Sequence, residues 1–163
     1  PETGSGLKTD KIGVIEVRGR NLFKGYWNMP EKTAEEFRED GFFITGDLGK
    51  IDVDGYVHIL GRDKDLIISG GFNVYPKEVE TLIDDIDGVV ESAVFGVPHD
   101  DFGESVVAVV VSTSITPELV TSSLAGKLAR FKQPKKVFVV NSLPRNTMGK
   151  VQKNRLRDLY ASV

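Results

Sequence analysis

Residues 65–88, DLIISGGFNVYPKEVETLIDDIDG, change from strand periodicity to helix periodicity within one segment. An apolar run at 66–68 has strand length, Gly70-Gly71 predicts a turn, and residues 72–75 predict a returning strand. From Pro76 onward the apolar residues recur at helical spacing until Gly88 ends the pattern (Val79, Leu82, Ile83, Ile86). The segment therefore predicts a β-hairpin followed by an amphipathic helix.

The rest of the second half continues this alternation. β-branched runs predict strands at 92–97, 105–112 and 136–140, and Thr116-Pro117 predicts the start of a helix that reaches about residue 130. A final helix is expected over roughly 152–161, with three side chains facing inward (Leu156, Leu159, Tyr160). This order predicts a small α+β domain with helices packed on one short sheet.

The first half reads differently, as short strands separated by turns. Strands are predicted at 13–18, 22–27, 42–45, 49–53 and 56–60, and a short helix at 30–37, where proline fits the first turn. Asp54-Gly55 is a hairpin signal. We therefore expect residues 7–61 to form a twisted antiparallel sheet, with the domain boundary in the polar run at 62–65.

Composition excludes several classes of protein. The chain has no cysteine, which excludes disulfides, thiol catalysis and zinc–thiolate sites and fits a reducing compartment. The longest apolar run, at 106–111, is far shorter than the ~20 residues that a membrane helix needs. Residues 1–6, PETGSG, predict a turn-rich loop with no initiator Met and no signal pattern. We expect the C-terminal part of a longer, cytoplasmic protein, with a mitochondrial location as the alternative in a eukaryote.

Charge is distributed unevenly along the chain. The net charge is −3, yet ten of the 21 Lys and Arg residues lie between Lys127 and Arg157, where no Asp or Glu occurs. Within this stretch Lys150 follows the turn-rich run PRNTMG at 144–149, so its cation can meet a small, multiply charged anion. Nucleic acid is the alternative ligand, but the stretch contains no recognisable nucleic-acid module.

Three short motifs could also bind a ligand. Asp47 ends a strand beside a glycine and could accept two hydrogen bonds from a vicinal diol such as a ribose, or simply cap a turn. Arg62 could donate to phosphate or ribose oxygens, but it and Lys64 also fit the role of solvated linker charges. The glycines in the run 69–71 let another group approach the backbone closely, or they form a plain hairpin turn.

Other familiar motifs do not fit. Gly149-Lys150 is not a phosphate-binding P-loop, because Pro144 stands where that loop needs glycine and Val151 where it needs Ser or Thr. The run DVDG at 52–55 lacks the spacing of a calcium loop and predicts a hairpin instead. His58 and His99 have no partner at a suitable spacing, so we expect both to be structural and predict no metal ligands.

The order of these motifs carries a resemblance. TGDLGKIDVDGYVHILGR at 45–62, GRDKDLIISGGFNVYPKEVE at 61–80, GVPHDDFGE at 96–104 and LPRNTMGKVQKNRLR at 143–157 resemble the adenylate-forming superfamily. This superfamily includes acyl-CoA synthetases, firefly luciferase and the adenylation domains of peptide synthetases. The resemblance covers nearly the whole chain and implies that residues 1–62 end a large AMP-binding domain, 63–65 form a hinge, and 66–163 form a small mobile domain.

The resemblance also implies a role for each matching residue. Lys150 would be catalytic and reach the carboxylate and the α-phosphate during adenylation. Asp47 would hold the ATP ribose, Arg62 would contact ribose or phosphate, and Lys64 would be the hinge. Ser69, Gly70 and Gly71 would line the channel for the pantetheine arm of CoA. Three basic residues would contact the CoA phosphates (Arg130, Lys132, Lys135).

Overall likeness is greatest to malonyl-CoA synthetases. The resemblance therefore implies an ATP-dependent acid–CoA ligase that uses Mg²⁺ with its ATP, takes CoA and a small acid such as malonate, and has its own N-terminal domain as partner. The chain alone is expected to be inactive. Other short-chain or aromatic acyl-CoA ligases, and a stand-alone CoA- or anion-binding domain, are the alternatives.

Overall fold

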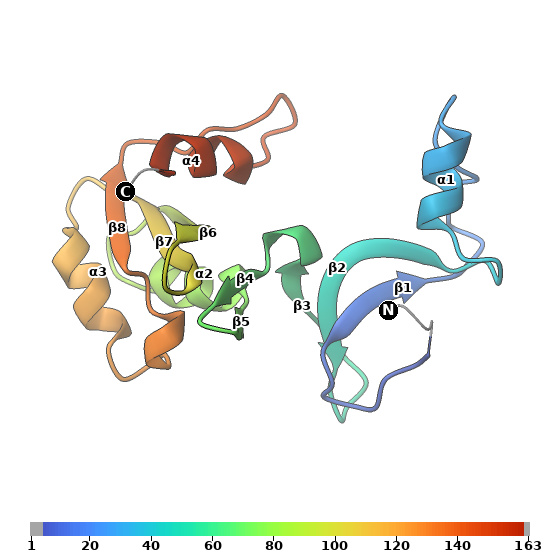
Figure 1. The fold of residues 1–163 in the computed structure, drawn as a ribbon, viewed down its shortest axis with the longest axis horizontal. Helices are drawn as coiled ribbons and strands as arrows, with labels where there is room; N and C mark the ends of the chain where they lie inside the picture. The colour runs from blue at the N-terminus through green and yellow to red at the C-terminus, as the bar shows by residue number, and fades with distance from the viewer. Residues whose placement is uncertain (1–4, 162–163) are drawn as a thin grey trace. The chain divides into compact units, whose positions relative to one another are not determined.

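The computed structural model describes residues 5–161, and its internal contacts divide the chain into two units, 1–64 and 65–163 (Figure 1). Part of the turn-rich loop predicted at 1–6 lies outside the described residues. Within them, no helix is long and apolar enough to cross a membrane. Each unit is described separately below.

The first unit is built on a three-stranded antiparallel sheet in the order β1-β2-β3. Its strands are β1 (Gly13–Val17), β2 (Phe43–Ile51) and β3 (Val57–Arg62), and α1 (Pro30–Glu36) lies between β1 and β2 in the chain. The predicted helix is confirmed, with proline in its first turn, where its missing N–H costs no hydrogen bond. The predicted antiparallel sheet is also confirmed.

Two predictions for this sheet were wrong. The strands expected at 42–45 and 49–53 form one continuous strand, β2, because Gly46 has a φ of +70° and a register shift between Leu48 and Gly49 absorbs the irregularity. Residues 22–27 form no strand. Two of their aromatic side chains instead pack together: the Phe23 ring lies 5.0 Å from that of Tyr26 and 5.2 Å from that of Phe43.

The second unit contains a five-stranded sheet. It runs in the order β5-β4-β7-β6, and β8 pairs with β7 (β4 Ile67–Ser69, β5 Phe72–Val74, β6 Glu91–His99, β7 Gly103–Val111, β8 Lys136–Val140). All pairings are antiparallel except that of β7 with β8, which is parallel. β7 is thus the central strand, and its run of valines has the β-branched composition that a strand buried on both faces needs.

Helices cover both faces of this sheet. The even-numbered residues of β7 pack with α2 (Pro76–Asp84) and α3 (Pro117–Leu124), and the odd-numbered ones pack with α4 (Lys153–Tyr160) (Figure 1). Each fully buried valine contributes about 1.5–3 kcal/mol to stability. The α+β class predicted from the sequence is confirmed, and so is the amphipathic helix after the hairpin at 65–75.

Two details of the helices differ from the prediction. α3 ends at Leu124, because Ala125 is extended and Gly126 has a φ of +79°; a short 3-10 turn, Arg130–Lys132, follows. In α4, Leu156 is buried as predicted, but Leu159 is 67% exposed. The neighbouring Tyr160 packs against the core as predicted, and its ring stacks on Phe138 at 4.3 Å.

Candidate functional site

Lys150 lies at the end of a tight turn that closes on itself. Arg145 and Val151 form an antiparallel bridge, and Gln152 N donates to the Pro144 carbonyl at 2.8 Å. Inside the turn, the Asn146 Oδ1 accepts from the amides of Met148 at 3.0 Å and of Lys150 at 2.9 Å. Asparagine is favoured where a side chain must replace a backbone acceptor in this way. The backbone of Lys150 is therefore held in one conformation.

The side chain of Lys150, in contrast, is exposed. Among residues 5–161 the structure records no ion pair for its ammonium, whereas several other cations of the basic stretch pair with carboxylates (Lys132 with Glu78, Arg145 with Glu91, Lys153 with Glu80, Arg157 with Asp65). Four of the ten basic residues between Lys127 and Arg157 are thus paired within the fold. Lys150 remains an accessible cation on a rigid turn.

Asp47 and Arg62, both predicted to contact the nucleotide, are brought together. They are cross-strand partners on β2 and β3, and Arg62 Nε lies 3.0 Å from Asp47 Oδ1. The Arg62 guanidinium also donates to the Thr45 carbonyl at 2.8 Å. Asp47 N in turn donates to Thr45 Oγ1 at 3.0 Å. The two side chains form one polar site at the sheet, with a carboxylate oriented by a guanidinium.

The run 69–71 forms the tight turn between β4 and β5. Both glycines have positive φ, +59° for Gly70 and +80° for Gly71, and Gly70 N donates to the Phe102 carbonyl at 2.9 Å. A Cβ added at Gly71 would meet no atom within 4 Å, so conformation rather than crowding selects glycine there. Ser69 is only 4% exposed, which leaves the two glycine backbones as the accessible surface of this turn.

The three basic residues predicted to contact CoA phosphates differ in their surroundings. Lys132 Nζ donates to both oxygens of Glu78 at 2.7 Å. Lys135 Nζ lies 5.5 Å from the centre of the Phe102 ring. Arg130 is exposed on the 3-10 turn. Lys132 therefore already has a carboxylate partner, while Arg130 and Lys135 lie nearer to solvent.

Lys64, the predicted hinge, lies in the short 3-10 turn Asp63–Asp65. The division between the two units falls directly after it. Asp65, the next residue, accepts from Arg157 of α4 at 2.6 Å. The first residue of the second unit is thus tied to that unit's last helix.

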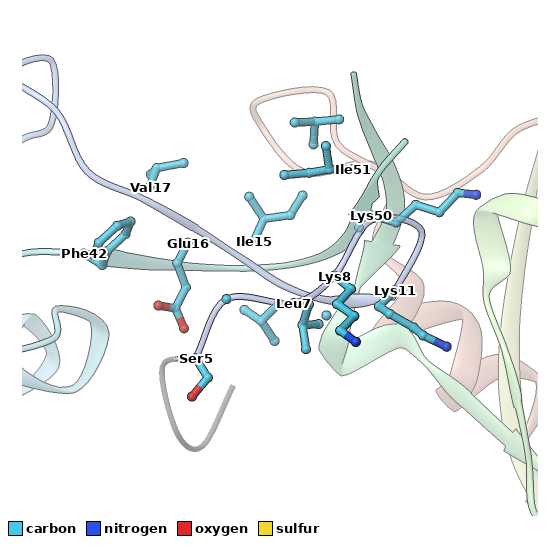
Figure 2. Close-up of a pocket in the computed structure, with 15 residues that line it drawn as sticks. Ser5, Leu7, Lys8, Lys11, Ile15, Glu16, Val17, Phe42, Lys50 and Ile51 are labelled. Atoms are coloured by element: carbon cyan, nitrogen blue, oxygen red, sulfur yellow. The ribbon is translucent and has the colours of Figure 1, made fainter. Parts of the chain in front are cut away.

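A groove of the first unit contains none of the predicted site residues. It lies against β1 and β2 with a volume of about 390 Å³ (Figure 2). Figure 2 shows Lys8 and Lys11 with their ammonium groups on the same side and the Glu16 carboxylate apart from them. The Arg38 guanidinium binds this carboxylate at 2.6 and 2.7 Å and holds the pKa of Glu16 below its usual range.

The hairpin at 52–55 is confirmed as structural. Asp52 Oδ1 accepts from Asp54 N at 3.0 Å and from Tyr56 N at 2.9 Å, and its Oδ2 lies 2.6 Å from His58 Nε2. The hydrogen bond from His58 is the main reason that the pKa of Asp52 is lowered. Among residues 5–161 no group of three or more His, Cys, Asp or Glu side chains is arranged to hold a metal.

Sequence reasoning missed the acidic partners that hold the basic stretch in place. Glu80, only 7% exposed, accepts from Lys153 Nζ at 2.6 Å and from Val94 N at 2.9 Å through one oxygen. Glu91 accepts from Arg145. These carboxylates lie 50 or more positions away in the chain, so no local pattern links them to Lys150. Only Asn146, four residues before Lys150, carried a local turn signal.

Comparison with known proteins gives consistent results. Residues 78–150 match the model of the AMP-binding enzyme C-terminal domain. Long-chain-fatty-acid–CoA ligase FadD13 of Mycobacterium tuberculosis is 43% identical over 152 residues, which cover 92% of this chain and 30% of that protein. Malonate–CoA ligase of Arabidopsis thaliana is 40% identical over 160 residues, covering 90% of this chain and 26% of that protein.

The structural comparison agrees. ATP-bound MatB from Rhodopseudomonas palustris, a malonyl-CoA synthetase, is 66% identical with a TM-score of 0.91, and the match covers 99% of this chain and 33% of MatB. The chain thus spans about a third of the length of these relatives. The order of motifs, the fold of the second unit and these matches together show that the chain belongs to the AMP-binding enzyme family and carries its C-terminal domain.

Proposed function

We propose that this chain is the C-terminal part of an ATP-dependent carboxylic acid–CoA ligase whose acid is malonate. The observation that carries the proposal is the exposed Lys150 ammonium on a rigid turn, inside a domain that matches AMP-binding enzymes. Residues 1–62 would end the large AMP-binding domain, 63–65 would be the hinge, and 66–163 the small mobile domain. The exposure of large apolar side chains in the first unit, such as Trp27 at 89%, supports its membership of a larger domain.

The proposed reaction has two steps. First, a carboxylate oxygen of the acid attacks the α-phosphorus of ATP, and pyrophosphate leaves. This step brings two anions together, so an ammonium directed at that point stabilises the transition state electrostatically. Lys150 suits this role because its flexible stem lets a cation reach in while its backbone stays fixed.

In the second step the CoA thiol, as it loses its proton, attacks the acyl carbonyl, and AMP leaves. The turn at 69–71 would line the channel for the pantetheine arm, because its two glycine backbones permit close approach. Rotation about Lys64 would exchange the Lys150 turn for this glycine turn between the two steps. Arg130 and Lys135 remain our candidates for CoA phosphate contacts, with Lys132 dependent on release from Glu78.

In the first unit, Asp47 would accept hydrogen bonds from the ribose hydroxyls of ATP, with Arg62 holding the carboxylate in place and facing ribose or phosphate oxygens. Mg²⁺ would arrive with ATP, bound by the phosphate oxygens. The remaining partner would be the chain's own N-terminal domain. We expect the enzyme to be cytoplasmic, as a chain without cysteine fits a reducing compartment.

A panel of acids tests this proposal on the full-length enzyme, by CoA- and ATP-dependent release of pyrophosphate. Malonate is expected to give the highest kcat/KM, since MatB is the relative of highest identity among those named above. A preference for a fatty or aromatic acid would move the assignment to another acyl-CoA ligase. The 163-residue chain alone should form no thioester; detectable turnover by it, or none by the full-length enzyme with any acid, would contradict the proposal.

A further inference from the structure

Arg145 connects the Lys150 turn to the sheet. Its Nη1 donates to the carbonyl of Gly149, the residue directly before Lys150, and its Nη2 donates to the carboxylate of Glu91. One guanidinium therefore contacts both the turn and the sheet, as only the planar fork of arginine can. Asn146 shapes the turn internally, whereas Arg145 links the turn to the first residue of β6, in addition to the packing of Leu143 and Val151 against the core.

Glu91 is itself fixed by the sheet. It is the first residue of β6 and pairs in register with Val111 of β7. Residues 93–97 of β6 are buried, and Val94 and Phe95 are fully enclosed. A contact to Glu91 is thus a contact to the rigid core of the unit, with little freedom at that end.

A contribution to the stability of the fold does not explain the Arg145–Glu91 ion pair well. The Arg145 and Glu91 side chains are 44% and 30% exposed, and ion pairs of this kind add little to the free energy of unfolding. Its effect on the orientation of the turn can be large, because an error of about 1 Å in the placement of a reacting group can cost roughly a hundredfold in rate. The second contact, to the backbone beside Lys150, ties the turn to the same guanidinium.

We propose that Arg145 and Glu91 are positioning residues that hold the Lys150 turn in the orientation needed for adenylation. The proposal rests on the function proposed above and adds to it: Lys150 supplies the charge, and the Glu91–Arg145–Gly149 chain of hydrogen bonds directs it. Thioester formation does not use Lys150, so this chain of hydrogen bonds, called the clamp below, serves adenylation only.

The kinetic test uses full-length Arg145→Ala and Glu91→Ala enzymes. The kcat for ATP–pyrophosphate exchange should fall roughly ten- to hundredfold with KM for ATP nearly unchanged, while thioester formation from supplied acyl-adenylate stays within about twofold. The exchange rate of Arg145→Lys should lie between those of the wild type and Arg145→Ala, because a single ammonium cannot reach both acceptors as the guanidinium does. Lys77→Ala, which removes an exposed cation whose partner Asp84 lies 4.0 Å away, is the matched control and should be unaffected.

A charge swap separates positioning from simple ion pairing. Glu91→Arg combined with Arg145→Glu keeps an opposite pair, but a carboxylate at 145 cannot donate to the Gly149 carbonyl. The rate of ATP–pyrophosphate exchange in the swapped enzyme should therefore stay as low as in Arg145→Ala. Recovery in the swapped enzyme, unchanged activity in Arg145→Ala, or equal loss in both half-reactions would overturn the proposal.

A measurement without catalysis keeps the two proposals distinguishable. Hydrogen exchange at the Asn146 and Gln152 amides, which close the turn, should be roughly tenfold faster in full-length Arg145→Ala, since losing a charge-assisted hydrogen bond costs about 1.4 kcal/mol or more. If the wild-type enzyme adenylates no acid, the proposed function fails, and amide hydrogen exchange alone tests the clamp. Unchanged amide exchange rates in Arg145→Ala would then overturn the clamp.

Discussion

At the scale of single residues, the candidate site depends on how the cations of the basic stretch are held. Lys132, Lys153 and Arg157 each contact a carboxylate within 2.7 Å. These pairs hold the 3-10 turn Arg130–Lys132 and the helix α4 to the rest of the second unit. The Lys150 ammonium lies in the same basic stretch but extends from a turn whose own hydrogen bonds are satisfied by Asn146. Identical residue types thus have different roles because of their partners.

Lys150→Ala should lower the rate of adenylation in the full-length enzyme by about 10²–10³-fold, the usual cost of removing one preorganised electrostatic contact to a transition state. Thioester formation from supplied acyl-adenylate should be nearly unchanged. ATP–pyrophosphate exchange and CoA thioester formation measure the two steps separately. Lys127→Ala, an exposed lysine of the same basic stretch, is the control. Equal loss in both steps would rule out the role assigned to Lys150.

Glu16 should titrate below its usual range, because the Arg38 fork binds its ionised form. A folded pKa below the unfolded value means that the pair stabilises the fold above about pH 4.5, and that this contribution is lost as the pH falls through the folded pKa. Carboxyl ¹³C NMR titration measures the pKa directly. Arg38→Met should raise it, whereas Lys24→Met should not; a Glu16 pKa indifferent to Arg38→Met would contradict this account.

At the scale of elements, the helices show how packing selects among equally apolar residues. α4 offers Leu156 and Leu159 in the same short helix, and only the first faces the odd-numbered valines of β7. Tyr160 faces the core as predicted, and its ring stacks on Phe138 of β8. The spacing of apolar residues therefore predicted the helix correctly but not the full set of inward side chains.

Leu156→Ala should lower the free energy of unfolding of the second unit by about 2–5 kcal/mol, because a fully buried leucine leaves a cavity that its neighbours fill only in part. Leu159→Ala is the matched control on the same helix and should change it by no more than about 0.5 kcal/mol. Urea denaturation followed by circular dichroism measures both. Similar losses in the two variants would show that α4 packs differently.

At the scale of the whole molecule, the residues assigned to the reaction are distributed over both units. Asp47 and Arg62 belong to the first unit, Gly70 and Lys150 to the second, and Lys64 precedes the division between them. The chain spans about a third of the length of its relatives, so a complete site would also need residues that this chain does not contain. The proposed chemistry is therefore a property of the longer protein.

Lys64→Pro in the full-length enzyme should slow thioester formation by roughly tenfold or more and leave adenylation nearly intact, because proline fixes φ at the position assigned to the hinge and rotation of the small domain is required between the steps. Lys64→Ala, which keeps the backbone free to rotate, is the control. Single-turnover measurements of each half-reaction distinguish them. Unchanged rates in Lys64→Pro would remove this residue from the mechanism.

Local information in the chain was sufficient for the α+β class, the hairpin at 65–75, α1, α2 and the turn before Lys150, since periodicity, proline, glycine and asparagine act over a few residues. It was insufficient for the exposure of Leu159, which depends on packing between distant segments. It was also insufficient for the continuity of β2 and the early end of α3, because the spacing of apolar residues does not reveal the positive φ of Gly46 and Gly126. The site divides in the same way. Residue types and motif order indicated Lys150, Asp47 and Arg62 as ligand contacts, whereas two pairings exist only in the folded chain: that of Asp47 with Arg62 across β2 and β3, and that of Arg145 with Glu91, 54 positions away.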